Sequence, residues 1–258
     1  MSYLPGKFVW FEHASSDPAA ARKFYEPLFG WHVENMAMGD QQYPMIMNGQ
    51  DGIGGFFRSD DAKDSARWVS YVSVPDVDKT YAAALAAGAT SESPPIDYGP
   101  VGRGAAIVDP TGARISLWKS AQEDRPDVEQ APDGSWVWNE LYTSNVDTAL
   151  AFYKKLLGYT VQAMDMGDQG TYHVLRTAGD TGRGGVMKSP DPKMPAQWVP
   201  YVHVKDCDAT LAKAKQLGAN VCLEGTDIPE VGRIGMLVDP QGATIAVIKT
   251  APMQKKQA

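Results

Sequence analysis

The stretch "FVWFEHASSDPAAARKFYEPLFGW" at residues 8–31 decides the fold, because the chain repeats it as "WVWNELYTSNVDTALAFYKKLLGY" at residues 136–159. Residues 6–31 and 134–159 share 10 identities in 26 positions, and residues 101–121 and 231–251 share 11 in 21. Unrelated windows of average composition would share only about one or two. The chain is therefore a tandem duplication, and its fold must be interpreted as a repeat.

Each copy is itself subdivided. After the short strand "FVWF", Asp17 stands where a helix N-cap would, ahead of the apolar stripe Ala20, Phe24 and Leu28, and Gly30 ends the helix. Three short strand-like runs follow, and a second, fainter unit then begins at "WVSYVSV". This predicts a strand, a helix and three strands, four times over. A unit of about 65 residues is too small to close a good core alone, so we expect units to pair within each half.

The copies set the expected domain boundaries. We predict a first domain over 1–121, a linker over 122–135, a second domain over 136–251 and a tail over 252–258. The linker "SAQEDRPDVEQAPDGS" is rich in Asp, Glu and Pro and poor in apolar residues.

Bulk composition excludes several functional classes. The chain is 43% hydrophobic and 21% charged, with net charge −7 and pI about 5.1, which disfavours electrostatic binding of nucleic acid. The start of the sequence lacks the pattern of a signal peptide, and no apolar run reaches membrane-spanning length. The two cysteines, Cys207 and Cys222, match no zinc or redox spacing. We expect a cytoplasmic monomer or homodimer with no nucleic-acid or membrane partner.

The modules and motifs resemble the vicinal oxygen chelate superfamily, which includes glyoxalase I, bleomycin resistance proteins and extradiol dioxygenases. The resemblance rests on "FY" in the first helix of each copy, on "DPTG" and "DPQG" before the last strands, and on "WNEL", "FYKKLLGY" and "DPTGARISLW". These details look closest to the two-domain, lactoylglutathione-lyase-related branch, which includes a glyoxalase-like mycobacterial antigen. The resemblance implies an α+β fold in which four βαβββ modules pair into two tandem cup domains. It leaves the chemistry open, since the superfamily hosts several reactions on one scaffold.

In metal-using members of this superfamily, His or Glu side chains on the concave face of each cup hold one divalent ion. The matching places here hold neither an imidazole nor a carboxylate; they are Trp10, Val69 and Ser116 in the first copy and Trp138, Val199 and Ala246 in the second. The resemblance therefore implies a cup without the usual metal site and without a cofactor.

One metal-dependent alternative uses the second cup. His203, Glu140 and His173 could form a nonstandard site of two histidines and one carboxylate for Ni²⁺, Zn²⁺, Mn²⁺ or Fe²⁺. The competing interpretation of His203 is a pocket-lining or hydrogen-bonded histidine. His13 and His32, beside aromatic residues, are interpreted as structural or surface histidines.

Glu12 and Glu140 are the candidate catalytic residues. Strand alternation points Glu12 the same way as Trp10, and Glu140 the same way as Trp138, which in the alignment is into the cup. A carboxylate desolvated beside an indole has a raised pKa and can act as a general base or accept a ligand's hydrogen bond. The structural alternative is a buried ion pair with the repeated arginines, Arg103 or Arg233.

A repeated aromatic set accompanies the two glutamates. Such walls suit flat apolar ligands, and they can equally fill the cup as core; the set is Trp10, Trp138, Tyr71, Tyr201, Trp68, Trp198 and Trp118. Trp118 has Ile248 as its counterpart, so the first cup is expected to be the more aromatic. The runs "GIGG" (52–55) and "GRGG" (182–185) fit no phosphate loop, and we interpret them as close strand approaches or bulges.

Three functional hypotheses follow from the sequence. The first is a metal-independent protein that binds a small organic molecule in an aromatic-lined cup, with acid–base chemistry by Glu12 or Glu140. The second is a divalent-metal-dependent lyase or dioxygenase using the second cup. The third is a noncatalytic interaction protein whose cups are filled by their own aromatic side chains.

Overall fold

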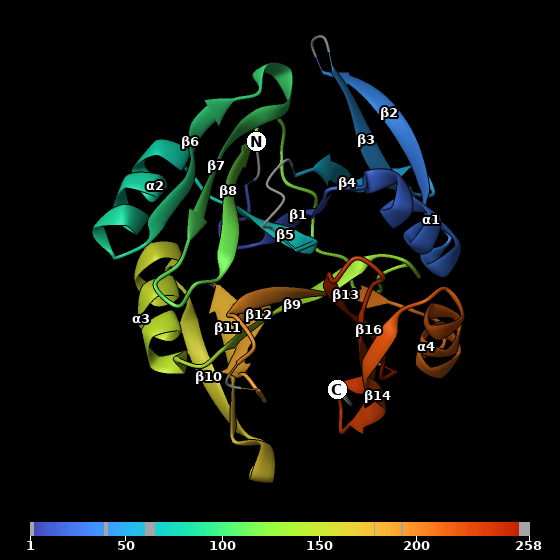
Figure 1. The fold of residues 1–258 in the computed structure, drawn as a ribbon. Coiled ribbons are helices and arrows are strands. Elements are labelled where there is room, and N and C mark those ends of the chain that lie inside the picture. The colour runs from blue at the N-terminus through green and yellow to red at the C-terminus, as the bar shows by residue number, and fades with distance from the viewer. Residues whose placement is uncertain (1–2, 39–40, 60–64, 178, 192, 253–258) are drawn as a thin grey trace. The chain divides into compact units, whose positions relative to one another are not determined.

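The computed structural model describes residues 3–38, 41–59, 65–177, 179–191 and 193–252. Within them the module of a strand, a helix and three strands occurs four times (Figure 1). The first copy holds module 1, made of β1 (Phe8–Ser15), α1 (Pro18–Phe29), β2 (His32–Met38), β3 (Gln41–Asn48) and β4 (Asp51–Arg58). It also holds module 2, made of β5 (Arg67–Ser73), α2 (Val77–Ala86), β6 (Thr90–Asp97), β7 (Gly102–Val108) and β8 (Arg114–Ser120).

The second copy repeats this order. Module 3 consists of β9 (Trp136–Thr143), α3 (Val146–Leu157), β10 (Thr160–Asp165), β11 (Thr171–Thr177) and β12 (Thr181–Lys188). Module 4 consists of β13 (Gln197–His203), α4 (Cys207–Gln216), β14 (Asn220–Ile228), β15 (Gly232–Val238) and β16 (Thr244–Thr250). Short 3₁₀ turns occur at Gly99–Val101 and Gly167–Gln169. No helix in the described part of the chain is long and apolar enough to span a membrane.

The predicted helix ends are confirmed. The Asp17 carboxylate accepts a hydrogen bond from the Ala20 N–H at 3.1 Å, and Asn145 caps α3 in the same way. Gly30 and Gly158 end α1 and α3 in the left-handed conformation, which glycine adopts without strain.

The strands form two eight-stranded sheets, one for each copy. Their hydrogen-bonded orders are β2-β3-β4-β1-β5-β8-β7-β6 and β10-β11-β12-β9-β13-β16-β15-β14. Strand β12 pairs in parallel with β9, β5 with β8 and β13 with β16, and outer pairs such as β11–β12 and β7–β8 are antiparallel hairpins. The predicted α+β fold of four βαβββ modules in two tandem domains is confirmed.

The compact units combine modules from both copies. Unit 1 comprises Met1–Phe11, Val69–Val128 and Trp138–Val199, and unit 2 comprises Glu12–Trp68, Glu129–Val137 and Pro200–Ala258. In unit 1, α2 packs against α3, and in unit 2, α1 packs against α4, as Figure 1 shows. The expected pairing within each half therefore holds for the strands, whereas each helix-covered core draws on modules of different copies.

The core of unit 1 illustrates this exchange. It joins Ile107, Ile115 and Leu117 of module 2 to Leu141 and Phe152 of module 3, all nearly or fully excluded from solvent. Burying a large aliphatic or aromatic side chain stabilises a fold by roughly 1.5–3 kcal/mol, so this shared core binds the two modules strongly.

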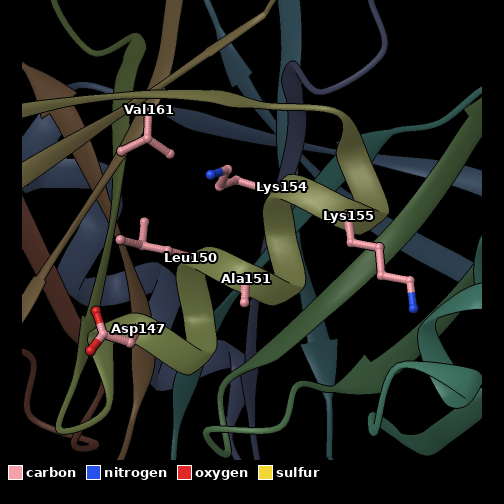
Figure 2. A pocket seen from close by; sticks show the side chains of 6 residues that line it. All are labelled: Asp147, Leu150, Ala151, Lys154, Lys155 and Val161. Atoms are coloured by element: carbon pink, nitrogen blue, oxygen red, sulfur yellow. The ribbon is translucent and has the colours of Figure 1, made fainter.

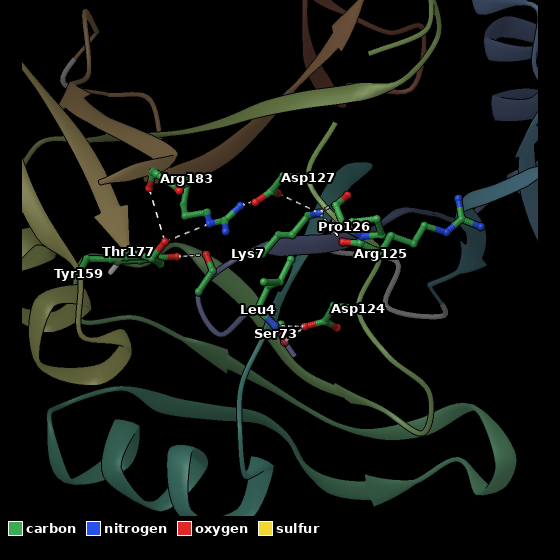
Figure 3. Close-up of polar contacts among 12 residues, drawn as sticks. Leu4, Lys7, Ser73, Asp124, Arg125, Pro126, Asp127, Tyr159, Thr177 and Arg183 are labelled. Atoms are coloured by element: carbon green, nitrogen blue, oxygen red, sulfur yellow. Dashed lines mark hydrogen bonds and ion pairs between the residues drawn. The ribbon is translucent and has the colours of Figure 1, made fainter. Parts of the chain in front are cut away.

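The acidic segment that joins the two copies is fastened to unit 1 (Figure 3). The Asp124 carboxylate accepts a hydrogen bond from the Leu4 N–H at 2.7 Å. Asp127 faces Lys7 Nζ at 3.1 Å and Arg183 Nη1 at 2.7 Å. The hydrogen bond from Arg183 is the main cause that lowers the pKa of Asp127. The segment that composition marks as a linker thus makes specific contacts along its first residues.

Candidate functional site

Glu140 forms a buried carboxylate site in unit 1. It is 4% exposed and lies on β9, on the face opposite to Leu141, which belongs to the core beneath α3. The Tyr142 hydroxyl donates a hydrogen bond to Glu140 Oε2 at 3.2 Å, and the Tyr172 hydroxyl also bonds to this carboxylate. Trp138 Nε1 donates to the Tyr172 hydroxyl at 2.8 Å. Trp138 and Glu140 therefore share one face of the strand, as alternation predicts.

The surroundings of Tyr172 keep its hydroxyl protonated, so that it can donate a hydrogen bond to Glu140. Burial first, and then the charge of the Glu140 carboxylate, raise the pKa of Tyr172 well above its ordinary value. The hydroxyl therefore stays protonated at neutral pH and donates to the carboxylate. A hydrogen bond to an ionised acceptor is roughly twice as strong as one between neutral groups.

Unit 2 holds the equivalent dyad. The Tyr43 hydroxyl of β3 donates to Glu12 Oε1 at 2.6 Å, and Glu12 lies on β1, on the face opposite to His13, which packs against Tyr25 of α1. Unlike Glu140, Glu12 is half-buried, as is Tyr43. A tyrosine–glutamate hydrogen bond thus recurs in both copies, and Glu12 is the more exposed of the two glutamates.

Two glycines make room for these tyrosines. A Cβ atom added at Gly55 would lie 2.0 Å from the Tyr43 hydroxyl, and one added at Gly185 would lie 1.9 Å from the Tyr172 hydroxyl. Gly185 pairs directly with Glu140 across the β12–β9 ladder. The last glycine of "GIGG" and of "GRGG" therefore allows a close approach, as interpreted from the sequence. The group that approaches is the tyrosine side chain of the neighbouring strand.

The arginines suggested as partners of the two glutamates bind elsewhere. Arg103 Nε donates to Asp78 at 2.7 Å, and Arg233 Nε donates to Asp208 at 2.8 Å, with Asp227 also 3.1 Å from Arg233. The proposed ion pairs of Glu12 and Glu140 with Arg103 and Arg233 are therefore wrong. The long arginine side chains instead join a strand to the first turn of the neighbouring helix.

The metal-dependent alternative is also wrong in its ligand set. His173 is aligned with Val186 and through it with Leu141, whereas Glu140 is aligned with Gly185. Neighbouring residues of a strand point to opposite faces, so the His173 ring and the Glu140 carboxylate do not converge. Over the described ranges, no group of three or more His, Cys, Asp or Glu side chains is placed to hold a metal ion. The donor atoms therefore do not fit the divalent ion used elsewhere in the superfamily.

The remaining histidines have local partners. His203 Nδ1 lies 3.2 Å from Asp133 Oδ1, too poorly aligned for a hydrogen bond, and His203 Nε2 lies 3.2 Å from the Thr250 hydroxyl. His32 is exposed beside Glu34. His203 is thus a hydrogen-bonded histidine, which was the competing interpretation of that residue.

The repeated aromatic residues divide into two groups. Trp68 and Trp198 are core residues whose indole N–H groups donate to the hydroxyls of Tyr25 and Tyr153, each at 2.9 Å. The half-buried pair Tyr71 and Trp118 stands edge to face with ring centroids 6.1 Å apart. Trp10 is half-buried and Tyr201 is buried, at 4% exposed.

The tyrosines of both "FY" motifs bind the aspartates of the "DP" turns. Tyr153 donates to Asp109 Oδ2 at 2.8 Å, and Tyr25 donates to Asp239 Oδ2 at 2.9 Å. The other carboxylate oxygen of each aspartate accepts backbone N–H groups of its own turn. These bonds join modules 2 and 3 in unit 1 and modules 1 and 4 in unit 2.

Unit 2 adds a histidine to this network. His13 is 0% exposed, and its Nε2 lies 2.8 Å from Asp239 Oδ2. Burial alone would raise the pKa of Asp239, but the hydrogen bond and charge of His13 together bring it below its ordinary value. The equivalent residue of the second copy is Leu141. His13 is therefore a structural histidine, as interpreted from the sequence, and its role is to complete a buried ion pair.

Two open hollows lie away from these carboxylates. One, of about 620 Å³, lies beside α3 and is lined by Asp147, Leu150, Ala151, Lys154, Lys155 and Val161 (Figure 2). The other, of about 400 Å³, lies where β14 and β16 end and β15 begins, and it includes Arg233 and Lys249. Neither Glu12 nor Glu140 lines either hollow, so the chemistry of the carboxylates rests on their own neighbours.

A protein of tandem βαβββ modules with paired eight-stranded sheets is the class that the fold defines. The family model of the glyoxalase/bleomycin resistance protein/dioxygenase superfamily matches residues 7–117, and the glyoxalase-like domain model matches residues 138–248. The chain belongs to this superfamily.

Curated relatives match along nearly their whole length. "Putative glyoxylase CFP32" of Mycobacterium tuberculosis is 36% identical over 257 residues, covering 98% of each chain. The anthracycline biosynthesis protein DauV of Streptomyces sp. is 29% identical over 263 residues, covering 96% of this chain and 94% of the relative.

Solved structures show the same fold at low identity. The Mn(II)-bound glyoxalase from Novosphingobium aromaticivorans superposes with a TM-score of 0.64 at 17% identity, covering 98% of this chain and 86% of that one. The 2,3-dioxygenase LapB from Pseudomonas sp. KL28 gives 0.63 at 14% identity, covering 100% and 96%. Both are similar in architecture, and neither similarity transfers a reaction.

Proposed function

We propose that the protein binds a small organic molecule at the Glu12–Tyr43 dyad without a metal ion. The observation that carries the proposal is the 2.6 Å hydrogen bond from Tyr43 to a half-buried Glu12. The neutral Tyr43 hydroxyl orients the carboxylate of a residue that solvent partly reaches. Such a carboxylate accepts a hydrogen bond from a ligand and, when the geometry is right, removes a proton from it.

The dyad supplies what a metal-free site requires. Tyr43 orients the Glu12 carboxylate. Because partial burial weakens competition from water, a hydrogen bond from the ligand to this carboxylate is stronger than the same bond in solution. When Glu12 takes a proton from the ligand, the Tyr43 hydroxyl can hold the hydrogen-bond network in place. The name of the relative DauV, which refers to anthracycline biosynthesis, supports an organic molecule as the ligand.

Glu12→Gln should weaken ligand binding while Glu140→Gln preserves it. The amide keeps the shape of the side chain and removes the charge that strengthens the hydrogen bond, so affinity should fall about tenfold or more. The measurement is a fragment screen of monocyclic organic acids, phenols and amines by saturation-transfer NMR, on the wild type and both variants. Equal loss in the two variants, or none in Glu12→Gln, would contradict the proposal.

A further inference from the structure

Trp118 differs from other tryptophans of the chain in how its indole is held. Five of them donate the indole N–H to a protein oxygen, namely Trp31, Trp68, Trp136, Trp138 and Trp198. Within the described ranges Trp118 Nε1 has no such partner, and solvent reaches this atom of a half-buried side chain. Packing therefore holds this indole, and its polar edge faces water.

Two glycines let the indole lie flat against the sheet. A Cβ atom added at Gly102 would lie 2.7 Å from Trp118 Cζ2, and one added at Gly104 would lie 2.9 Å from Trp118 Cε3. Gly104 pairs directly with Trp118 across the β7–β8 ladder. The neighbouring residues Ala105 and Leu117 belong to the core, so Trp118 lies on the sheet face away from it. One face of the indole thus rests on β7, and the exposed part of the ring points away from that strand.

Two tyrosine rings flank the indole. Tyr71 of β5 stands edge to face with it at 6.1 Å, and Tyr98, which follows β6, is tilted by 46° at 5.8 Å. Strands β5, β8, β7 and β6 are neighbours in this order, so Tyr71, Trp118 and Tyr98 form an aromatic row across the sheet (Figure 1). Tyr98 is 41% exposed and Tyr71 is half-buried. The aromatic row therefore presents ring surface to solvent.

The fold does not require this arrangement. In the second copy, Ile234 and Ile248 take the places of Gly104 and Trp118, and they pair in the same register. Ile248 is 6% exposed. Two aliphatic side chains thus fill the place that the first copy gives to an indole lying over a glycine.

The charged residues beside Trp118 and Gly104 point away from the aromatic row. Arg103 and Lys119 are their sequence neighbours, and strand alternation places both on the opposite face of the sheet. Arg103 there pairs with Asp78 at 2.7 Å. A molecule stacked on the indole therefore meets ring surface rather than these charges, which favours an uncharged ligand.

We infer that Trp118 is the stacking platform of a second binding site, in unit 1, for an uncharged planar aromatic molecule. The ring of the ligand lies over the indole face that the two glycines leave open, in the offset stack that aromatic rings prefer. The tyrosines of the aromatic row bound it on either side. The site uses no residue of the Glu12–Tyr43 dyad, so it goes beyond the proposed function and does not depend on it.

Fluorine NMR of the full chain labelled with 5-fluorotryptophan tests the site. The probe is coumarin, a planar uncharged bicyclic lactone, and octahydrocoumarin is the matched lactone without an aromatic ring. The chain holds seven tryptophans, and the loss of one resonance in Trp118→Phe identifies that of Trp118. Coumarin should move this resonance saturably. Octahydrocoumarin should bind about tenfold more weakly, because stacking is lost.

Variants locate the site, with coumarin affinity measured by saturation-transfer NMR titration. Trp118→Ile, which introduces the residue of the second copy, should weaken binding about tenfold. Gly104→Ala should also weaken binding, since the new methyl group displaces the indole. Lys119→Gln, on the opposite face of the same strand, is the control and should leave the affinity unchanged. If Trp118→Ile does not fold, Gly104→Ala and the comparison of the two lactones on wild type decide the matter.

The outcomes separate this inference from the proposed function. Equal affinity for the two lactones, or unchanged coumarin binding in Trp118→Ile, would overturn the stacking site. Movement of other tryptophan resonances while that of Trp118 stays in place would do the same. Glu12→Gln should leave the coumarin titration unchanged. Loss of coumarin binding in Glu12→Gln, with the Trp118 resonance unmoved in wild type, would place the probe at the dyad, which overturns this inference and supports the proposed function.

Discussion

Asp239→Ala should lower the free energy of unfolding by about 3–5 kcal/mol, the range expected when one partner of a buried ion pair is removed. The Asp239 carboxylate, 4% exposed, receives His13 Nε2 at 2.8 Å and the Tyr25 hydroxyl at 2.9 Å on one oxygen. The other oxygen receives the N–H groups of Gln241 and Ala243 at 2.8 and 2.9 Å. Alanine leaves every one of these groups without its acceptor. Urea denaturation of the full chain measures the loss.

His13→Leu is the matched control, because the second copy carries Leu141 at the equivalent place. In unit 1 the equivalent carboxylate of Asp109 is buried without a histidine and is held by Tyr153 and by its own turn, so His13→Leu should be less destabilised than Asp239→Ala. The double variant should be more stable than the sum of the two single effects predicts, since the residues are in contact. If the loss of unfolding free energy in the double variant equals the sum of the losses in the two single variants, His13 and Asp239 do not interact as proposed.

The same pair gives unit 2 an acid-sensitive contribution to stability. The pKa of Asp239 is lowered on folding, so its contribution is present above the unfolded-state pKa of about 3.9 and is lost as pH falls through the lower folded-state value. Asp239→Asn should therefore show a flatter dependence of unfolding free energy on pH below about pH 4. An unchanged slope there would contradict the assignment.

Gly55→Ala should both destabilise the protein and separate Tyr43 from Glu12. Alanine in place of a strand glycine ordinarily stabilises by up to about 1 kcal/mol. Here the new Cβ would lie 2.0 Å from the Tyr43 hydroxyl, so the ring must shift, at a cost typical of overpacking, about 1–3 kcal/mol. The clash outweighs the gain, and ligand affinity should fall together with stability.

A second substitution identifies the cause. In the double variant Gly55→Ala with Tyr43→Ala, the methyl group has space, so the added cost of Gly55→Ala should disappear from the denaturation curve. Gly185→Ala, 1.9 Å from the Tyr172 hydroxyl, should behave in the same way in unit 1. Full stability and full affinity in Gly55→Ala would show that the close approach is not needed.

Much of the fold follows from local sequence chemistry. The duplication sets the number of modules, Asp17 and Asn145 begin their helices, and Gly30 ends one. Period-two alternation placed Glu140 on the face of Trp138, because that inference needs only the geometry of a single strand. The close-approach role of the glycine runs was also predictable, since neither run was followed by phosphate-loop residues.

The partners of the functional side chains were not predictable, because they come from elements that are distant in the sequence. Tyr43 of β3 reaches Glu12 of β1 past the intervening strand β4, and Tyr25 reaches Asp239 from the other copy. No periodicity within a strand or helix encodes such contacts. The sequence does hold a signal: Tyr43 and Tyr172 recur at equivalent places, as do Gly55 and Gly185. The pairing with arginines was wrong because Arg103 pairs instead with Asp78, in the first turn of α2.

The central proposal is that a tyrosine-held carboxylate binds the ligand of this chain without a metal ion, whereas the structurally similar glyoxalase from Novosphingobium aromaticivorans is Mn(II)-bound. The most direct measurement is elemental analysis of tag-free protein, as purified and after loading with Ni²⁺, Zn²⁺, Mn²⁺ and Fe²⁺ followed by dialysis. The account predicts far less than one ion per chain and no rise in melting temperature over buffer controls. About one retained ion per chain, lost in Glu12→Gln or Glu140→Gln, would contradict it.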